Sequence, residues 1–223
     1  SLVLLGGWGG QVSLMHGAYV GTGVFMMSWL SVTHGVPLEL AIPAAAFAGM
    51  LLGAIVGLPA LRLSGLQFAI ASLAFSGAAV EWLFHLEGVA RNVPRGHLFG
   101  IDLARTQNVF MIMLVVTAAC YVAVWNIRSS VYGAHLIASR DAPSMASHFG
   151  IKAGSTRIQA FLLASFIASL GGAFFGILIS SFNPVHFSLQ LSIALLLYTV
   201  IGGAESLAGP VLAGIAFGVL PEL

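Results

Sequence analysis

Residues 158–180 read IQAFLLASFIASLGGAFFGILIS, a stretch without one charged side chain. A helix that crosses the hydrocarbon core of a bilayer needs about 20 consecutive, mostly apolar residues. The stretch is continuously apolar, whereas membrane β-strands alternate in polarity. It therefore predicts a transmembrane helix. Four other stretches meet the same criterion, at roughly 12–32, 38–58, 66–86 and 109–127.

The composition of the whole chain fits a protein with several such helices. Of its 223 residues, 59% are apolar and 7% are charged, against about 25% charged in an average soluble domain. So few charges cannot cover a soluble fold of this length, so lipid must be the solvent for most of the exterior. We predict an all-α, polytopic transmembrane helix bundle that forms one domain over residues 1–223. The Lys and Arg residues form no patch, so nucleic acid is not an expected partner.

Both ends of the chain lie in apolar sequence. The chain starts at Ser1 within an apolar stretch, and it ends directly after the apolar run that closes at Leu220. No charged segment precedes an apolar one as in a signal peptide. We interpret the chain as an internal fragment of a longer membrane protein, a partial domain that lacks its terminal helices.

Two further apolar segments, 187–201 and 207–220, are shorter than a full span. Gly202, Gly203 and the polar residue Glu205 lie between them. Short, glycine-interrupted segments in transporters often mark broken helices beside a substrate pathway. The alternative is a tilted span followed by a helix that the end of the chain cuts short, and both remain open.

The distribution of basic residues gives a prediction of orientation. If the first five segments all span, loops 59–65 and 128–157 share one side of the membrane and loop 87–108 lies on the other. The first side carries Arg62, Arg128, Arg140, Lys152 and Arg157, and the second carries Arg91, Arg95 and Arg105. Cytoplasmic loops are enriched in Lys and Arg, so we predict that loop 128–157 is cytoplasmic.

Small residues recur at four-residue spacing in two of the predicted spans. One row consists of Ala45, Gly49, Gly53 and Gly57, and the other consists of Ala164, Ala168, Gly172 and Gly176. Residues four apart lie on one helix face, and small residues let the backbones of membrane helices approach closely. We therefore expect both rows to be helix-packing interfaces.

Polar residues near the start of the chain are candidates for a translocation pathway. Gln11, Ser13 and His16 follow the glycine-dense stretch 6–10, which forms helix poorly. A helix break there is tolerated only inside protein or beside a water-filled cavity. An ordinary interfacial helix start is the alternative. The sequence has no Walker A phosphate loop and no cluster with metal-ligand spacing, so we expect neither catalysis nor a cofactor in this chain.

Loop 128–157 contains a pattern typical of a short amphipathic helix at 142–149. Asp141 is a candidate N-cap and Gly150 a candidate terminator. One apolar face would consist of Ala142, Met145, Ala146 and Phe149. Such a face needs either a bilayer surface or a groove on a partner. Only Arg140 supplies a nearby positive charge for anionic lipid, so we expect a partner protein.

Three stretches resemble the permease subunits of ABC importers of the branched-chain amino acid type, in particular the LivM-like branch. They are GQVSLMHGAY at 10–19, GLPALRLSGL at 57–66 with AIASLAF at 69–75, and GGAESLAGPV at 202–211. Their order and spacing also agree with the family, so the resemblance covers essentially the whole chain. Met15 and Glu205 stand where the family pattern has glycine, and the acidic residues usual after Asp141 are missing. The resemblance is therefore to the family and not to one substrate.

The resemblance implies a multi-pass permease of the bacterial inner membrane that imports branched-chain amino acids or a related small polar solute. It implies a second permease subunit, ATPase subunits that hydrolyse the ATP, and a periplasmic solute-binding protein as partners. Helix 142–149 would be the coupling helix that docks in the ATPase, with Arg140, Asp141, Met145, Ala146, Phe149 and Gly150 as its residues. Gly202, Gly203 and Glu205 would join Gln11, Ser13 and His16 on the pathway. The alternative function is an ion-coupled secondary transporter, which would need a carboxylate or a His pair deep in the bundle.

Overall fold

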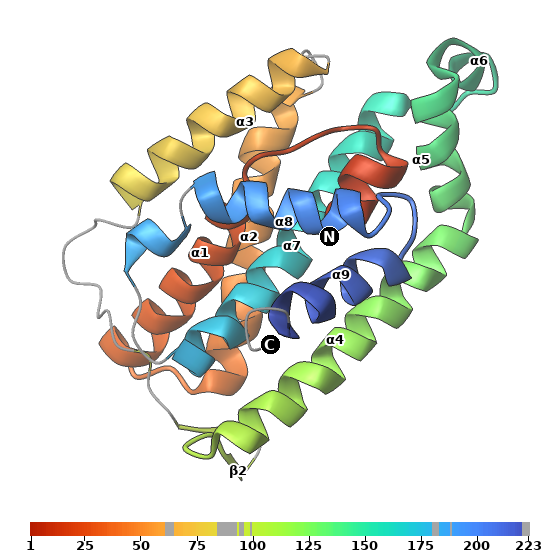
Figure 1. Ribbon diagram of the computed structural model, residues 1–223. Helices are drawn as coiled ribbons and strands as arrows, with labels where there is room; N and C mark the ends of the chain where they lie inside the picture. Colours follow the sequence, from red (N-terminus) through yellow and green to blue (C-terminus); the bar gives the residue numbers. More distant parts are fainter. Residues whose placement is uncertain are drawn as a thin grey trace.

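The computed structural model describes residues 1–60, 65–83, 93, 96–98, 100–179, 183–187 and 189–219. In this part of the chain the structure is helical apart from one two-stranded hairpin, which confirms the predicted all-α fold class (Figure 1). Three residues of the orientation argument, Arg62, Arg91 and Arg95, lie outside the described residues.

The helices and strands follow one another along the chain with short connections. The first half contains a π-helical segment η1 (Val3–Trp8), α1 (His16–Ser28) continued by η2 (Trp29–Thr33), α2 (Leu38–Ala60), α3 (Leu66–Ala78) continued by η3 (Ala79–Leu83), β1 (His97–Leu98) and β2 (Ile101–Asp102). The second half contains α4 (Thr106–Ser129), α5 (Val131–Asp141), α6 (Pro143–His148), α7 (Ala153–Ile179), the 3₁₀ turn η4 (Pro184–Phe187), α8 (Leu189–Ile201) and α9 (Ala208–Val219).

Three helices are long and apolar enough to cross a membrane. They are Leu38–Leu58 within α2, the whole of α4, and the whole of α7. These agree with the predicted spans 38–58, 109–127 and 158–180, with ends that shift by up to five residues. In α3 the apolar helix from Gln67 to Glu81 is shorter than a full span.

The predicted span 12–32 differs from the structure at its start. Residues up to Met15 are not helical, and helix begins at His16 and continues to Thr33. At 1.5 Å per residue this helix is roughly 27 Å long, which is close to the thickness of a hydrocarbon core. The missing turn is the interruption described below.

Helices α8 and α9 form a tight antiparallel pair (Figure 1). They contain 13 and 12 residues, so they are about 20 and 18 Å long. Gly202 and Gly209 bring their backbones into direct contact, and Tyr198 stacks on Phe217 with ring centroids 4.9 Å apart. Both described helices are too short for a straight crossing, which favours the broken-helix interpretation of this region.

The centre of the bundle is built from α1, α2 and α7. Along α2, a Cβ atom at Gly49 would overlap the side chain of Ser169, and one at Gly53 would overlap that of Ser165. Gly57 continues the row, with Phe161 3.3 Å from the position of its missing Cβ. Ser169 donates a hydrogen bond of 2.8 Å to the carbonyl of Ala45, so this interface is also bonded.

The other face of α7 packs on α1 through the second predicted row. A Cβ atom at Gly172 would overlap the backbone oxygen of Val20, and one at Gly176 would lie 2.9 Å from Val24. Ala168, one turn before Gly172, is buried in the core. Backbone contact at these points fixes α7 between α1 and α2, and this fixed core holds the start of α1 in place.

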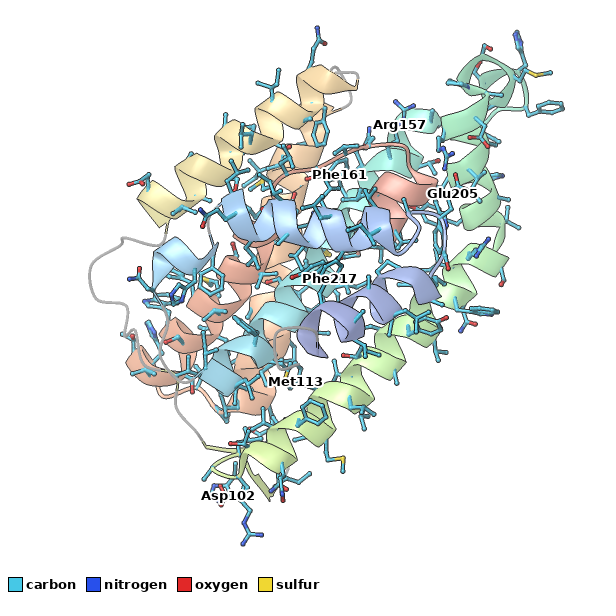
Figure 2. The ribbon with its side chains drawn as sticks, viewed as in Figure 1. Asp102, Met113, Arg157, Phe161, Glu205 and Phe217 are labelled. Carbon is cyan, nitrogen blue, oxygen red and sulfur yellow. The ribbon has the colours of Figure 1, made fainter. Side chains whose placement is uncertain are left out.

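The two connecting regions lie at opposite ends of the bundle. The β1–β2 hairpin precedes α4 at one end, marked by Asp102, and α5 and α6 follow α4 at the other, near Arg157 (Figures 1 and 2). Asn108 bonds the carbonyl of Asp102 at 2.8 Å, which holds the hairpin on the start of α4. The relative placement of the two loops is therefore the one that the orientation argument assumed.

Candidate functional site

The first helical region is interrupted between Gly10 and Met15. The amides of Gly9 and Gln11 still bond back to Leu4 and Leu5, at 3.1 and 3.0 Å, so the π-helical turn closes there. Gly10 then has a φ of 65°, which a residue with a side chain adopts only with strain. The predicted break therefore exists, but it follows the glycine-dense stretch instead of lying within it.

The glycines before the break serve close packing. A Cβ atom at Gly7 would overlap the backbone of Ala204, in the turn between α8 and α9. Glycine in this position allows two backbones to touch, so η1 stays helical despite its weak propensity. This contact explains why the break lies four or more residues later than the composition suggested.

Serine hydroxyls from neighbouring helices satisfy backbone amides at the break. Ser72 of α3 accepts a 3.0 Å bond from the amide of Leu14 and donates one of 2.8 Å to the carbonyl of Ala69. Ser192 of α8 accepts a 2.8 Å bond from the amide of Gly17, in the first turn of α1. Buried amides without partners are costly, so these two hydroxyls make the interruption stable inside the bundle.

Two buried aromatic side chains beside the break have polar atoms without a partner. His16 is 1% exposed and Tyr19 is fully buried, and their rings meet edge to face with centroids 5.7 Å apart. Neither ring nitrogen of His16 and not the hydroxyl of Tyr19 forms a hydrogen bond with a described residue, although the Ser13 backbone lies beside the imidazole. Such groups retain unused capacity for a water molecule or a polar solute.

The sequence candidates for the pathway divide into two neighbouring sets. Ser13 is buried with His16, and Gln11 is half-buried at the beginning of the interruption. Gly202, Gly203 and Glu205 belong to the α8–α9 turn, which lies against η1. The indole nitrogen of Trp8 donates a 3.2 Å bond to the carbonyl of Glu205, so the two sets meet across η1.

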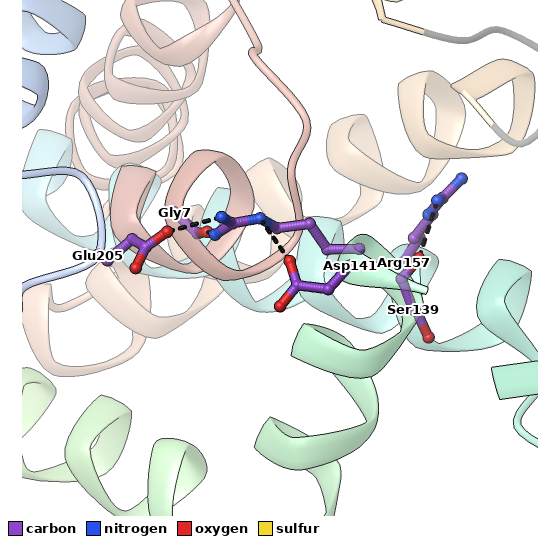
Figure 3. A network of polar contacts seen from close by, with 6 residues as sticks. Gly7, Ser139, Asp141, Arg157 and Glu205 are labelled. Atoms are coloured by element: carbon purple, nitrogen blue, oxygen red, sulfur yellow. Dashed lines mark hydrogen bonds and ion pairs between the residues drawn. The ribbon is translucent and has the colours of Figure 1, made fainter. Parts of the chain in front are cut away.

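Arg140 joins the α8–α9 turn to the end of α5 (Figure 3). One of its terminal nitrogens lies 2.6 Å from a carboxylate oxygen of Glu205, and the other donates a hydrogen bond to the carbonyl of Gly7. Its Nε lies 3.2 Å from a carboxylate oxygen of Asp141. The sequence assigned Glu205 to the pathway and Arg140 to coupling, and the structure places the two residues in one ion pair.

A short helix, α6, lies where the sequence pattern indicated one. Gly150 has a φ of 78°, and the amides of Gly150 and Ile151 bond back to Ser147 and Ala146 at 3.0 Å, which ends the helix. The assignment of Asp141 as its N-cap is wrong. Asp141 is the last residue of α5 and pairs with Arg140, and Ala142 takes the N-cap position without a side-chain bond.

The apolar face of α6 is divided between the bundle and the surface. Ala146 is buried, whereas Met145 is 62% exposed and Phe149 is 81% exposed. Two large apolar side chains therefore project together from the end of the molecule. The sequence did not indicate α5, which carries α6; Tyr132 anchors it with a 2.9 Å bond to the carbonyl of Thr156, and burial raises the pKa of the Tyr132 hydroxyl to about 12.

A large groove elsewhere on the molecule has the wrong chemistry for a polar solute. It lies between α4, the end of α7 and α9, and it has a volume of about 690 Å³. Its walls are almost entirely apolar, formed by residues such as Phe110, Leu178 and Val211. The described residues also hold no group of three or more metal-ligating side chains. The interruption and its neighbouring turn are therefore the candidate site.

These features define a polytopic α-helical membrane protein with a polar interruption in its first helical region. The chain belongs to the family described as the permease component of the branched-chain amino acid transport system, whose model matches residues 1–223. This match confirms the resemblance seen in the three sequence motifs and identifies the chain as a transport permease component. Comparison with curated proteins and with solved structures gave no match.

Proposed function

We propose that the chain is the membrane-spanning subunit of an ATP-driven importer for branched-chain amino acids or a related small polar solute. The observation that carries this proposal is the exposed apolar pair Met145 and Phe149 on α6, at one end of a permease-family bundle. An exposed aromatic and a methionine on a short helix are suited to a groove on a partner protein. The ATPase subunits supply that groove in this proposal.

The other expected partners and the location follow from the same proposal. ATP binds to and is hydrolysed by the ATPase subunits, and this chain holds no cofactor. A second permease subunit and a periplasmic solute-binding protein complete the importer in the bacterial inner membrane. The end with α5 and α6 faces the cytoplasm, and the end with the β1–β2 hairpin faces the periplasm.

The buried polar residues favour ATP-driven transport over the ion-coupled alternative. In the described part of the chain the buried polar side chains are serines, threonines and His16, without a buried carboxylate. Ion-coupled transporters typically use intramembrane carboxylates or histidine chains. A single histidine beside hydroxyl groups is better suited to contact with a neutral or zwitterionic solute than to ion coupling.

Transport in proteoliposomes tests the proposed function. The complex, purified with its partners, should take up leucine, isoleucine or valine only with ATP and the solute-binding protein present, and urea and short amides serve as alternative solutes. A non-hydrolysable ATP analogue should abolish uptake. Uptake driven by a proton or sodium gradient without ATP would instead establish the secondary transporter.

His16 provides a second test because its structural and transport roles predict opposite results. His16→Phe removes two unpaired nitrogens from a buried site, and each such group costs about 1–3 kcal/mol, so thermal stability in detergent should be unchanged or higher. If His16 contacts the solute in transit, uptake should fall about tenfold, the effect of roughly 1.4 kcal/mol.

The matched control for this variant is His34→Phe, at an exposed histidine after α1. It should leave both stability and uptake unchanged. Normal uptake by the His16→Phe complex would remove His16 from the pathway.

A further inference from the structure

The ion pair between Arg140 and Glu205 connects three segments that are far apart in the sequence. Arg140 lies in the last turn of α5, Glu205 in the α8–α9 turn, and Gly7, whose carbonyl also accepts from Arg140, in η1. Figure 3 shows Glu205 and Gly7 on one side of the guanidinium and Asp141 on the other. One side chain thus bonds both elements that border the interruption.

Packing makes this connection specific for arginine. A Cβ atom at Gly10 would lie 2.8 Å from Cγ of Arg140, so the aliphatic part of Arg140 lies directly on the first residue of the interruption. The neighbouring Trp8 bonds the Glu205 carbonyl, and the guanidinium of Arg128 lies 5.6 Å from the centre of its ring. A displacement of α5 therefore acts on η1, on Gly10 and on the α8–α9 turn together.

The exposure of the pair suits a contact that forms and breaks. The side chains of Arg140 and Glu205 are 32% and 67% exposed, and ion pairs this accessible to solvent contribute little to stability. Three serine-bonded or glycine-packed interfaces already hold the bundle together without it. The pair is therefore not needed to keep the fold, and it lies where α5 meets the interruption.

We propose that the Arg140–Glu205 ion pair is a coupling contact that transmits movement of α5 and α6 to the interrupted region of the bundle. This rests on the proposed function, because α6 moves only if an ATPase holds it. When α6 is displaced with its ATPase, α5 carries Arg140 with it. The α8–α9 turn and η1 then move relative to His16, and the segment between Gly10 and Met15 changes its opening.

A double-mutant cycle on the complete importer tests the contact. Arg140→Met retains the aliphatic part that lies on Gly10 but loses all donors, and Glu205→Ala removes the acceptor. The measured quantity is the number of solute molecules transported per ATP hydrolysed in proteoliposomes. We expect each single variant to retain its ATPase and its ATP hydrolysis while this ratio falls at least about fivefold.

The double variant should be no worse than Arg140→Met alone, because partners in one interaction give non-additive effects. Two controls match the charge changes: Lys152→Met on the same loop and Asp141→Ala at the other carboxylate beside Arg140. Both should keep the ratio within about twofold of the parent.

Three results would overturn the coupling contact. They are an unchanged ratio in either single variant, effects that multiply in the double variant, or a fall in folded yield that accounts for the loss. Failure of the proposed function is a different result, because the unmodified chain would then purify without any ATPase or would transport solute without ATP.

Discussion

Gly172→Leu should prevent assembly of the helix bundle. The backbone oxygen of Val20 occupies the position of the new Cβ atom, so α1 and α7 must separate before leucine fits. Overpacking of a core commonly costs about 1–3 kcal/mol, and here backbone has to move, so we expect roughly 3 kcal/mol or more. Membrane yield and the thermal midpoint in detergent measure the effect.

The neighbouring residue provides the control for this experiment. Gly171 is exposed and has open space where its Cβ atom would lie. Gly171→Leu therefore makes the same chemical change one residue away and should leave yield and midpoint nearly unchanged. Equal behaviour of the two variants would show that α1 and α7 are not in backbone contact at Gly172.

Replacing Met145 and Phe149 together by serine should abolish uptake. Both side chains are largely exposed, so their loss should not disturb the bundle. Anchors at the centre of an interface each contribute about 2 kcal/mol or more, so the double variant should bind the ATPase on the order of a thousandfold more weakly. Co-purification of the ATPase measures binding, and membrane expression measures folding.

Ser144→Ala is the control on the same helix, since Ser144 lies off the apolar face. It should retain the ATPase and normal uptake. If the double serine variant also co-purifies with the ATPase and transports normally, α6 is not the docking element and the assignment of this end to the cytoplasm loses its main support. Retention of the ATPase with altered membrane association would indicate a bilayer-surface role.

The sequence predicted the parts of the fold that depend on local pattern. Long apolar runs located α2, α4 and α7, because a bilayer-spanning helix must satisfy its own backbone and present an apolar exterior. Four-residue spacing of small residues located the faces on which α7 packs. Gly150 was recognised as a helix terminator because the left-handed conformation that it adopts strongly favours glycine.

The parts that were missed depend on contacts between distant residues. Ser192 lies 175 residues from the amide of Gly17 that it bonds, and Glu205 lies 65 residues from Arg140. No periodicity in one sequence relates such positions. Helix α5 was missed because its mixed sequence reads as part of a charged loop, and Asp141 was misassigned because an aspartate at the end of one helix resembles the start of the next.

The serine bonds at the interruption also determine how it can fluctuate. An ordinary helix end frays on its own, because its terminal bonds lie within one segment. The amides of Leu14 and Gly17 are instead bonded to hydroxyls of α3 and α8, so their exchange with solvent deuterium requires those helices to slide away. The two amides therefore act as native reporters of motion between helices, and their exchange rate in the working importer follows the opening of the bundle rather than the unwinding of α1.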